Sequence, residues 1–177
     1  MGATPTSIQV SVVDPVACIK VAGRANFSVS VDFKTLLHEL HERGFRLYLL
    51  DLSDCVIMDS TFLGILSGFS TKLGEEAKNP KTPCVQMLNA NERVKALIEN
   101  LGMEQLFKFR SGNNPFDPQF EEVQTSGEQN KAEVTRTCLQ AHETLMLINP
   151  KNVPKFKDVT KFLAEDLKKE ESSEAAG

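Results

Sequence analysis

Apolar residues recur along the chain with two spacings, which predict strands and helices in alternation. The β-branched runs at 8–13 and 16–22 flank Asp14-Pro15, a pair that favours a turn, and therefore predict an opening hairpin. The next segment predicts a helix, because four of its apolar residues recur every three or four positions: Phe33, Leu36, Leu37 and Leu40.

The run at 46–52 lacks alternation with polar residues, which is typical of a strand covered on both faces and central in its sheet. Beyond it the spacing predicts a helix after Asp59, a strand at 84–88, a helix ended by Gly102 and a last strand at 106–109. This order calls for parallel pairing with helices packed on the sheet. Residues 1–110 are therefore expected to form an α/β domain with a sheet of about five strands.

Residues 111–130 differ in composition and are expected to be a connector, in which Phe116 and Phe120 are the bulky apolar residues. Residues 131–170 then predict a C-terminal helical hairpin, and 171–177 a disordered tail. Two such helices cannot bury their apolar faces alone. The hairpin must therefore dock on its own domain, on a second copy in a homodimer, or on a partner.

Composition and charge argue against several functions. A net charge of -4 and a pI near 5.5 do not suit a protein that binds nucleic acid. No stretch approaches the roughly 18 uninterrupted apolar residues of a membrane helix, so no membrane association and a cytoplasmic location are expected. The cysteines are far apart and lack C-x-x-C spacing, which predicts reduced thiols and no metal site: Cys18, Cys55, Cys84 and Cys138.

A carboxylate and two hydroxyls, Asp59-Ser60-Thr61, lie where the second helix is predicted to begin. Free N–H groups and the positive end of the helix dipole favour anions there, so the triplet can cap the helix or host chemistry. Ser60, Gly64 and Gly68 follow at i, i+4 and i+8 and form a bare stripe with almost no side-chain bulk. Because each mid-helix glycine costs about 0.5–1 kcal/mol relative to alanine, something is expected to approach this bare stripe closely. It is either the domain's own sheet or another protein.

The order of elements, and the run M-D-S-T-F-L-G-I-L at 58–66 in particular, resembles the STAS family, which includes soluble anti-sigma factor antagonists. The antagonist motif is M-D-S-S-G-L-G, and the matching residues are Met58, Asp59, Ser60, Leu63 and Gly64. The resemblance covers residues 8 to about 110 and implies a STAS-like mixed sheet.

By this resemblance, Ser60, or alternatively Thr61, would be phosphorylated by a partner serine kinase that is also an anti-sigma factor. Asp59 would be the supporting carboxylate. The unphosphorylated protein would bind the kinase and so release a sigma factor, and phosphorylation would break the complex. The physics suits such a switch, because a phosphate adds about -1.5 to -2 charges beside Asp59 at the interface.

The chain departs from the antagonist pattern at two places. Antagonists usually carry G-E-L-D after the second strand, whereas Gly23 is followed here by Arg24, Ala25 and Asn26, so two acidic positions near the expected interface are lost. Phe62 replaces a glycine and serves either core packing or partner contact. The candidate supporting or partner-binding residues are therefore Arg24, Asn26, Asp59, Thr61, Phe62, Gly64 and Gly68.

Three other functions compete with this one. An aspartyl-phosphate receiver would use Asp51, but it needs an acidic pair after the first strand, where the sequence offers Asp14 alone. A zinc hydrolase would use His38 and His41, but H-E-L-H-E lacks the i, i+4 spacing, and a solvated helix face that includes Glu42 is expected. Neither an enzyme nor a cofactor is expected. A STAS scaffold, or a module that senses a small ligand such as a nucleotide, shares every fold-level feature with the antagonist.

Overall fold

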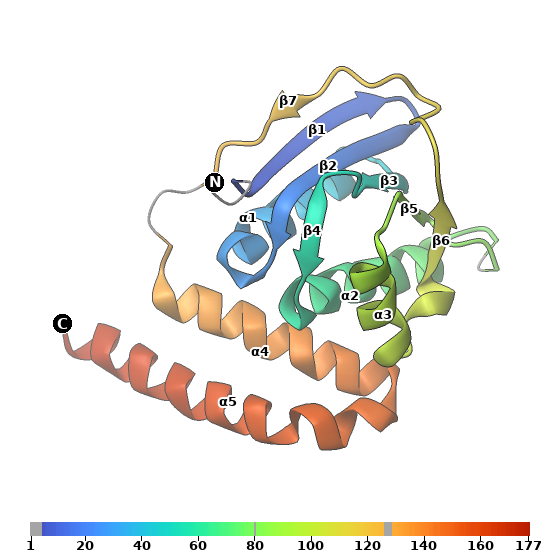
Figure 1. Cartoon of the computed structure of the whole chain (residues 1–177). Helices are drawn as coiled ribbons and strands as arrows, with labels where there is room; N and C mark the ends of the chain where they lie inside the picture. Colours follow the sequence, from blue (N-terminus) through green and yellow to red (C-terminus); the bar gives the residue numbers. More distant parts are fainter. Residues whose placement is uncertain (1–4, 80, 126–128) are drawn as a thin grey trace.

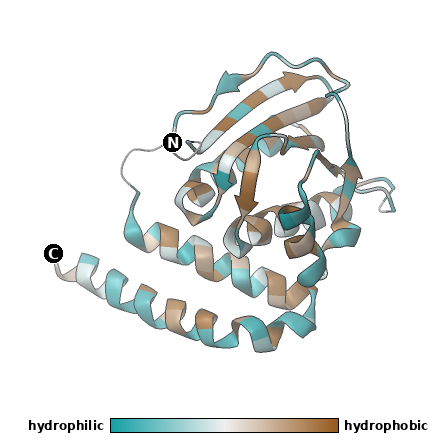
Figure 2. Ribbon diagram, viewed as in Figure 1, coloured by the Kyte–Doolittle hydropathy of each residue, from teal (hydrophilic) through white to brown (hydrophobic). Residues whose placement is uncertain are grey.

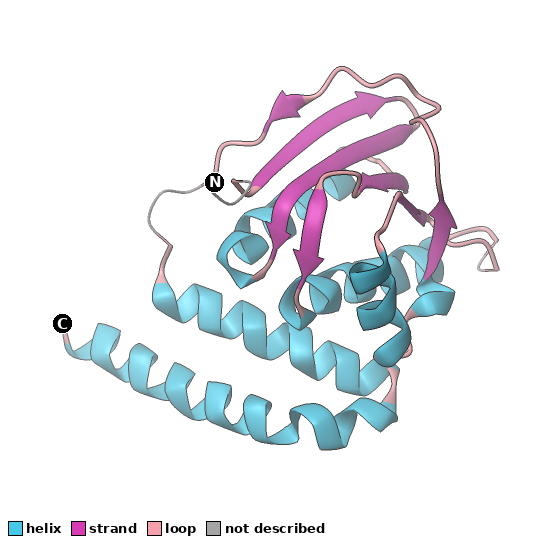
Figure 3. Cartoon of the chain, in the orientation of Figure 1, coloured by secondary structure: helices cyan, strands magenta, loops and turns pink. Residues whose placement is uncertain are grey.

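The computed structural model describes residues 5–79, 81–125 and 129–177 (Figures 1 and 3). Its strands are β1 (Ser7–Val13), β2 (Val16–Ala25), β3 (Leu47–Asp51), β4 (Cys55–Met58), β5 (Val85–Leu88), β6 (Phe107–Arg110) and β7 (Glu121–Glu122). Its helices are α1 (Ser30–Glu42), α2 (Ser60–Glu76), α3 (Glu92–Asn100), α4 (Lys131–Ile148) and α5 (Val153–Ala176). Short 3-10 turns are η1 (Phe27–Val29), η2 (Glu104–Leu106) and η3 (Pro150–Asn152). Residues 1–4 of the expected domain and 126–128 of the expected connector lie outside the described residues.

The strands form one mixed sheet in the order β6-β5-β3-β2-β1-β7, with β4 paired to β2. The opening hairpin β1–β2 is antiparallel, whereas β2, β3, β5 and β6 pair in parallel. Each crossover advances in the same direction, so right-handed connections place the helices on one face of the sheet (Figure 1). The predicted α/β class and mixed sheet are confirmed. The described chain has seven strands instead of about five, because β4 and the very short β7 were not predicted.

Strand β3 is covered on both faces, as its sequence predicts. Tyr48 and Leu50 belong to the main core under the helices. Leu49 points to the other face, where it joins a small cluster that Phe116 and Phe120 of the segment after β6 pack against. That segment also supplies β7, which pairs with β1. The two phenylalanines thus hold the connector against the face of the sheet that the helices leave free.

The C-terminal hairpin docks on its own domain, which is the first of the three predicted alternatives. Helix α4 lies along α2, and Leu145 of α4 is part of the main core. Asn152 secures the turn between the two helices, because its side-chain amide donates to the carbonyl oxygens of Leu101 and Leu145, each at 3.0 Å. Helix α5 covers α4 in turn and continues to Ala176, so the predicted disordered tail at 171–177 is wrong (Figure 1). Its side chains reach α4 through the Arg136–Glu171 ion pair, which a composition argument does not detect.

Apolar and polar residues alternate along β1 and β2, and they also alternate along α5 (Figure 2). Within the described ranges, none of the helices is both long enough and apolar enough to span a lipid bilayer.

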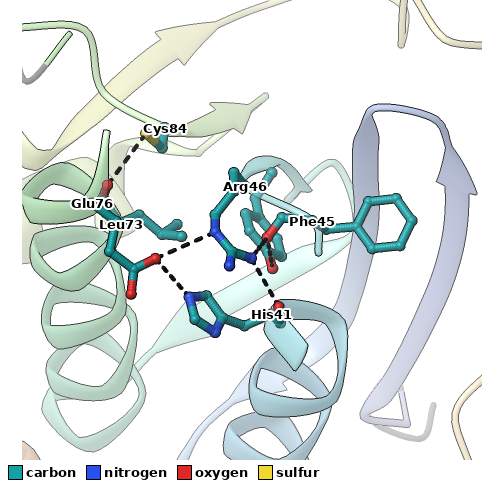
Figure 4. Close-up of polar contacts among 7 residues, drawn as sticks. His41, Phe45, Arg46, Leu73, Glu76 and Cys84 are labelled. Atoms are coloured by element: carbon teal, nitrogen blue, oxygen red, sulfur yellow. Dashed lines mark hydrogen bonds and ion pairs between the residues drawn. The ribbon is translucent and has the colours of Figure 1, made fainter. Parts of the chain in front are cut away.

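His41 is buried between α1 and α2, which corrects the expectation that it lies on a solvated helix face. Its Nε2 lies 2.8 Å from a carboxylate oxygen of Glu76 on α2, and Arg46 Nε lies 3.3 Å from the same oxygen (Figure 4). Arg46 also donates to the His41 carbonyl oxygen at 2.8 Å. The hydrogen bond from His41, aided by Arg46 and Lys72, holds the pKa of Glu76 below its ordinary value of 4.5. Helical spacing could not predict this, because it does not say which second helix faces α1.

Glu76→Gln is expected to lower the free energy of unfolding near neutral pH and to lose that effect in acid. A carboxylate with a lowered folded-state pKa contributes stability that is present above the unfolded pKa of 4.5 and is lost as pH falls through the folded value. Urea unfolding of both proteins from about pH 7 to about pH 3 should show a difference that shrinks towards acid. Glu75→Gln, at an exposed neighbouring position, is the control. A difference between wild type and Glu76→Gln that stays constant over this range would contradict the assignment.

Candidate functional site

Asp59 caps α2 and ties its start to the end of β2. One carboxylate oxygen accepts from the Phe62 N–H and the other from the Phe27 N–H, each at 2.8 Å. The Asp59 N–H donates to the Ala25 carbonyl oxygen, which continues the pairing of β2 with β4. Burial raises the pKa of Asp59, while the two N–H donors and nearby His142 act in the opposite direction. The predicted capping role is confirmed, and it leaves a largely buried carboxyl group beside Ser60.

Ser60 is the first residue of α2, is partly exposed, and contacts the C-terminal hairpin. Its hydroxyl lies 2.8 Å from Nε2 of His142 on α4. His142 Nδ1 lies 2.7 Å from the Cys138 carbonyl oxygen, which can only accept, so Nδ1 carries the hydrogen. In the neutral ring Nε2 is then an acceptor, and the Ser60 hydroxyl donates to it. His142 was not identified from the sequence, because it belongs to an amphipathic helix 82 residues further along the chain.

Thr61 and Phe62 point into the protein. Thr61 is 4% exposed, and Phe62 is fully buried, with its ring stacked on Phe33 at a centroid distance of 4.1 Å. Of the two roles predicted for Phe62, the structure shows core packing and not an accessible partner contact. The glycine of the antagonist motif is thus replaced here by a ring that anchors α2 to α1.

The bare stripe of α2 is occupied by α4. A Cβ added to Gly64 would lie 2.8 Å from Ala141 Cβ and closer still to the Ala141 carbonyl oxygen. At Gly68 the added Cβ would lie 3.1 Å from Thr144 Cγ2. The predicted close approach is therefore present, but it is made by the chain's own hairpin and by neither the sheet nor a second protein.

Arg24 lies at the end of β2, and Asn26 follows the last residue of that strand. Arg24 is exposed, and its main-chain N–H donates to Thr6 Oγ1. Asn26 caps η1, since its side-chain oxygen accepts from the Ser28 N–H and hydroxyl. Beside them an apolar rim remains exposed: Phe27 at 53%, Val56 at 46% and Ile57 at 42%. These three residues flank Asp59 in η1 and β4.

A groove of about 260 Å³ runs beside the bare stripe, between α1, α2 and α4. Gly64, Gly68 and Phe69 line it, and Lys34 and Lys72 reach it from opposite helices. Its lining is mainly apolar with two cationic side chains.

The other predicted chemical groups do not form a site. Asp51 accepts from the Ser53 N–H and hydroxyl, which makes it a turn-forming residue. The cysteines are free thiols. Among the described residues, no three or more His, Cys, Asp or Glu side chains are grouped to hold a metal ion.

Comparisons with known proteins place the fold. No protein-family model matches the chain, and no curated protein matches it either. Solved structures with this fold include a putative anti-sigma factor antagonist from Thermotoga maritima, with 18% identity, TM-score 0.50, and coverage of 60% of this chain and 86% of that one. An anti-sigma factor antagonist from Mycobacterium paratuberculosis has 17% identity, TM-score 0.51 and coverage of 59% and 85%. The antagonist SpoIIAA in its unphosphorylated form has 14% identity, TM-score 0.51 and coverage of 59% and 88%. The chain therefore has the STAS fold of the anti-sigma factor antagonists.

Gly64→Ala is expected to destabilise the protein, whereas Gly74→Ala is expected to stabilise it. Overpacking against Ala141 costs about 1–3 kcal/mol, which outweighs the gain of up to about 1 kcal/mol from replacing a helical glycine. Gly74 lies in the same helix, but an added Cβ there meets no described atom within 4 Å. Urea unfolding of both variants measures the difference, and equal stabilisation by the two would show that α4 does not pack on Gly64 in solution.

Proposed function

We propose that this chain is a phosphorylation-controlled interaction module of the anti-sigma factor antagonist type. It binds an anti-sigma factor with serine kinase activity while Ser60 is unmodified, and it acts without catalysis of its own. The observation that carries the proposal is the position of Ser60, a partly exposed hydroxyl on the first residue of α2 beside the capping carboxylate of Asp59. Anti-sigma factor antagonists have the same fold, and the structure of one of them, SpoIIAA, is that of its unphosphorylated form.

The charge at this helix start supports a switch. A phosphoserine adds about -1.5 to -2 charges, which free N–H groups at a helix N-terminus favour. Asp59 opposes the added charge, because its carboxyl group is largely buried and already binds two of the local N–H donors. A partner packed against Ser60 would prevent water from solvating the phosphate, so modification is expected to break the complex.

Ser60 is favoured over Thr61 as the phosphoacceptor. Thr61 is buried at 4% exposure, so a kinase would reach its hydroxyl only after α2 moved. The partner surface we propose is the apolar rim of Phe27, Val56 and Ile57, with Arg24 and Asn26 at its border. Exposed apolar side chains grouped beside a modifiable hydroxyl suit a protein interface better than isolated surface residues do.

Capture of the partner from native cells is expected to depend on both Ser60 and the apolar rim. Unmodified protein should retain a serine kinase, identified by mass spectrometry, and protein with phosphoserine incorporated at position 60 should not. Ile57→Asp should reduce capture by on the order of tenfold or more, as expected for a buried anchor at an interface. Leu147→Asp is the matched control, because Leu147 is 84% exposed on α4 and lies away from the rim.

Two results would overturn the proposal. One is equal capture by the unmodified and phosphorylated proteins. The other is native protein that carries no phosphate on Ser60 or Thr61 under any growth condition.

The groove beside the bare stripe supports a second candidate function, the sensing of a small ligand. Its volume of about 260 Å³ lies below the range of about 300–1,000 Å³ typical of ligand pockets, so a nucleotide would be buried only in part. Lys34 and Lys72 would favour an anionic group on such a ligand. Calorimetric titration of GTP and ATP into wild type and Lys34→Ala/Lys72→Ala decides this candidate. Binding that the double variant loses would support it, and no heat with wild type would exclude nucleotides.

A further inference from the structure

Ser60 is bound by the chain's own C-terminal hairpin. Its hydroxyl donates to Nε2 of His142 at 2.8 Å, and the His142 ring is fixed from behind by the hydrogen bond from Nδ1 to the Cys138 carbonyl oxygen. Phe156 of α5 packs edge-on against the same ring at a centroid distance of 4.9 Å. Both hairpin helices thus hold the imidazole over the start of α2, and the His142 residue is 7% exposed.

The contact between α2 and α4 restricts the space for a larger group on the side of Ser60 that faces His142. One helical turn further along, Gly64 meets Ala141 so closely that a single added Cβ would be 2.8 Å from the Ala141 Cβ. The next turn brings Gly68 against Thr144. Helix α4 therefore cannot move outward at His142 by the length of a phosphate while it keeps its contacts with both glycines.

Electrostatic repulsion, like packing, opposes a phosphate on Ser60 while α4 is docked. A phosphate on Ser60 would place its oxygens between His142 and the largely buried carboxyl group of Asp59. A protonated His142 could neutralise one negative charge, but the second would remain close to Asp59 under the covering helix. Water reaches this partly exposed position from one side, but it can surround a phosphate only when α4 moves away.

We propose that phosphorylation of Ser60 and docking of α4 on α2 exclude each other, so that the C-terminal hairpin is a built-in regulator of the phosphoacceptor. The inference rests on the proposed function only in taking Ser60 as the modified residue. While α4 is docked, the hairpin holds the Ser60 hydroxyl and covers the bare stripe. When Ser60 is phosphorylated, α4 is displaced and the stripe becomes accessible. Because coupling is reciprocal, anything that displaces α4 also favours modification of Ser60.

The test is hydrogen exchange of full-length protein with phosphoserine incorporated at position 60 during synthesis. Amides of α4 are expected to exchange on the order of 5- to 150-fold faster than in unmodified protein, the range of typical coupling free energies. Amides of β3 and β5 should keep their protection. Phosphoserine at Ser111, an exposed residue that follows β6, is the matched control and should leave α4 unchanged.

A second measurement uses a disulfide as a reporter of docking. Gly68→Cys/Thr144→Cys should form a disulfide under mild oxidation when Ser60 is unmodified, because a Cβ at position 68 lies 3.1 Å from Thr144 Cγ2. Phosphoserine at position 60 should lower its yield severalfold, and Gly68→Cys alone controls for reaction of the native thiols.

Unchanged α4 protection and an unchanged disulfide yield in the phosphorylated protein would overturn the proposal. Equal loss of protection in α4, β3 and β5 would do so as well, since it would show general unfolding instead of displacement of the hairpin. These outcomes are independent of the proposed function, which fails if Ser60 carries no phosphate in cells.

Discussion

The close approach of α4 to α2 at Gly64 is the contact on which the rest of the site depends. Two helix backbones meet there with no room for a side chain on α2, so Ala141 is buried and the next residue, His142, is placed over the first turn of α2. The imidazole then reaches the Ser60 hydroxyl. A mid-helix glycine costs about 0.5–1 kcal/mol, and the packing that it permits offsets this cost. The geometry of the candidate phosphoacceptor is thus determined partly by a residue one turn away.

The sequence predicted this approach but could not identify the element that makes it. Spacing of Ser60, Gly64 and Gly68 shows which face of the helix is bare, whereas the covering surface depends on how the hairpin docks. The apolar periodicity of α4 was identified correctly. Its buried face, however, also contains polar residues that hydrophobic periodicity does not count: Thr135, Thr137 and His142. A hydrogen bond across 82 residues between two such faces has no local signature.

The order of strands and helices was predictable because their signals, unlike that hydrogen bond, are local in the sequence. Strands buried on both faces, such as β3, and helices with a continuous apolar face leave strong periodic signals. β4 leaves a weak one, because it has four residues, of which Val56 and Ile57 are exposed. Phe62 illustrates the limit of a motif comparison. Its position beside the candidate phosphoacceptor allowed partner contact, and only the presence of Phe33 opposite it shows that the ring serves the core.

The docked hairpin also constrains how a partner can reach Ser60. A protein that used the bare stripe would first have to displace α4, exposing Leu145, which is fully buried, and Ala141. Burial of one leucine side chain contributes about 1.5–3 kcal/mol. Displacing α4 would therefore reduce the net binding free energy of a partner that uses the bare stripe. The apolar rim of Phe27, Val56 and Ile57 is already exposed and requires no such rearrangement. Initial docking on the rim is therefore favoured, and the bare stripe becomes available to a partner only in a state that has already released α4.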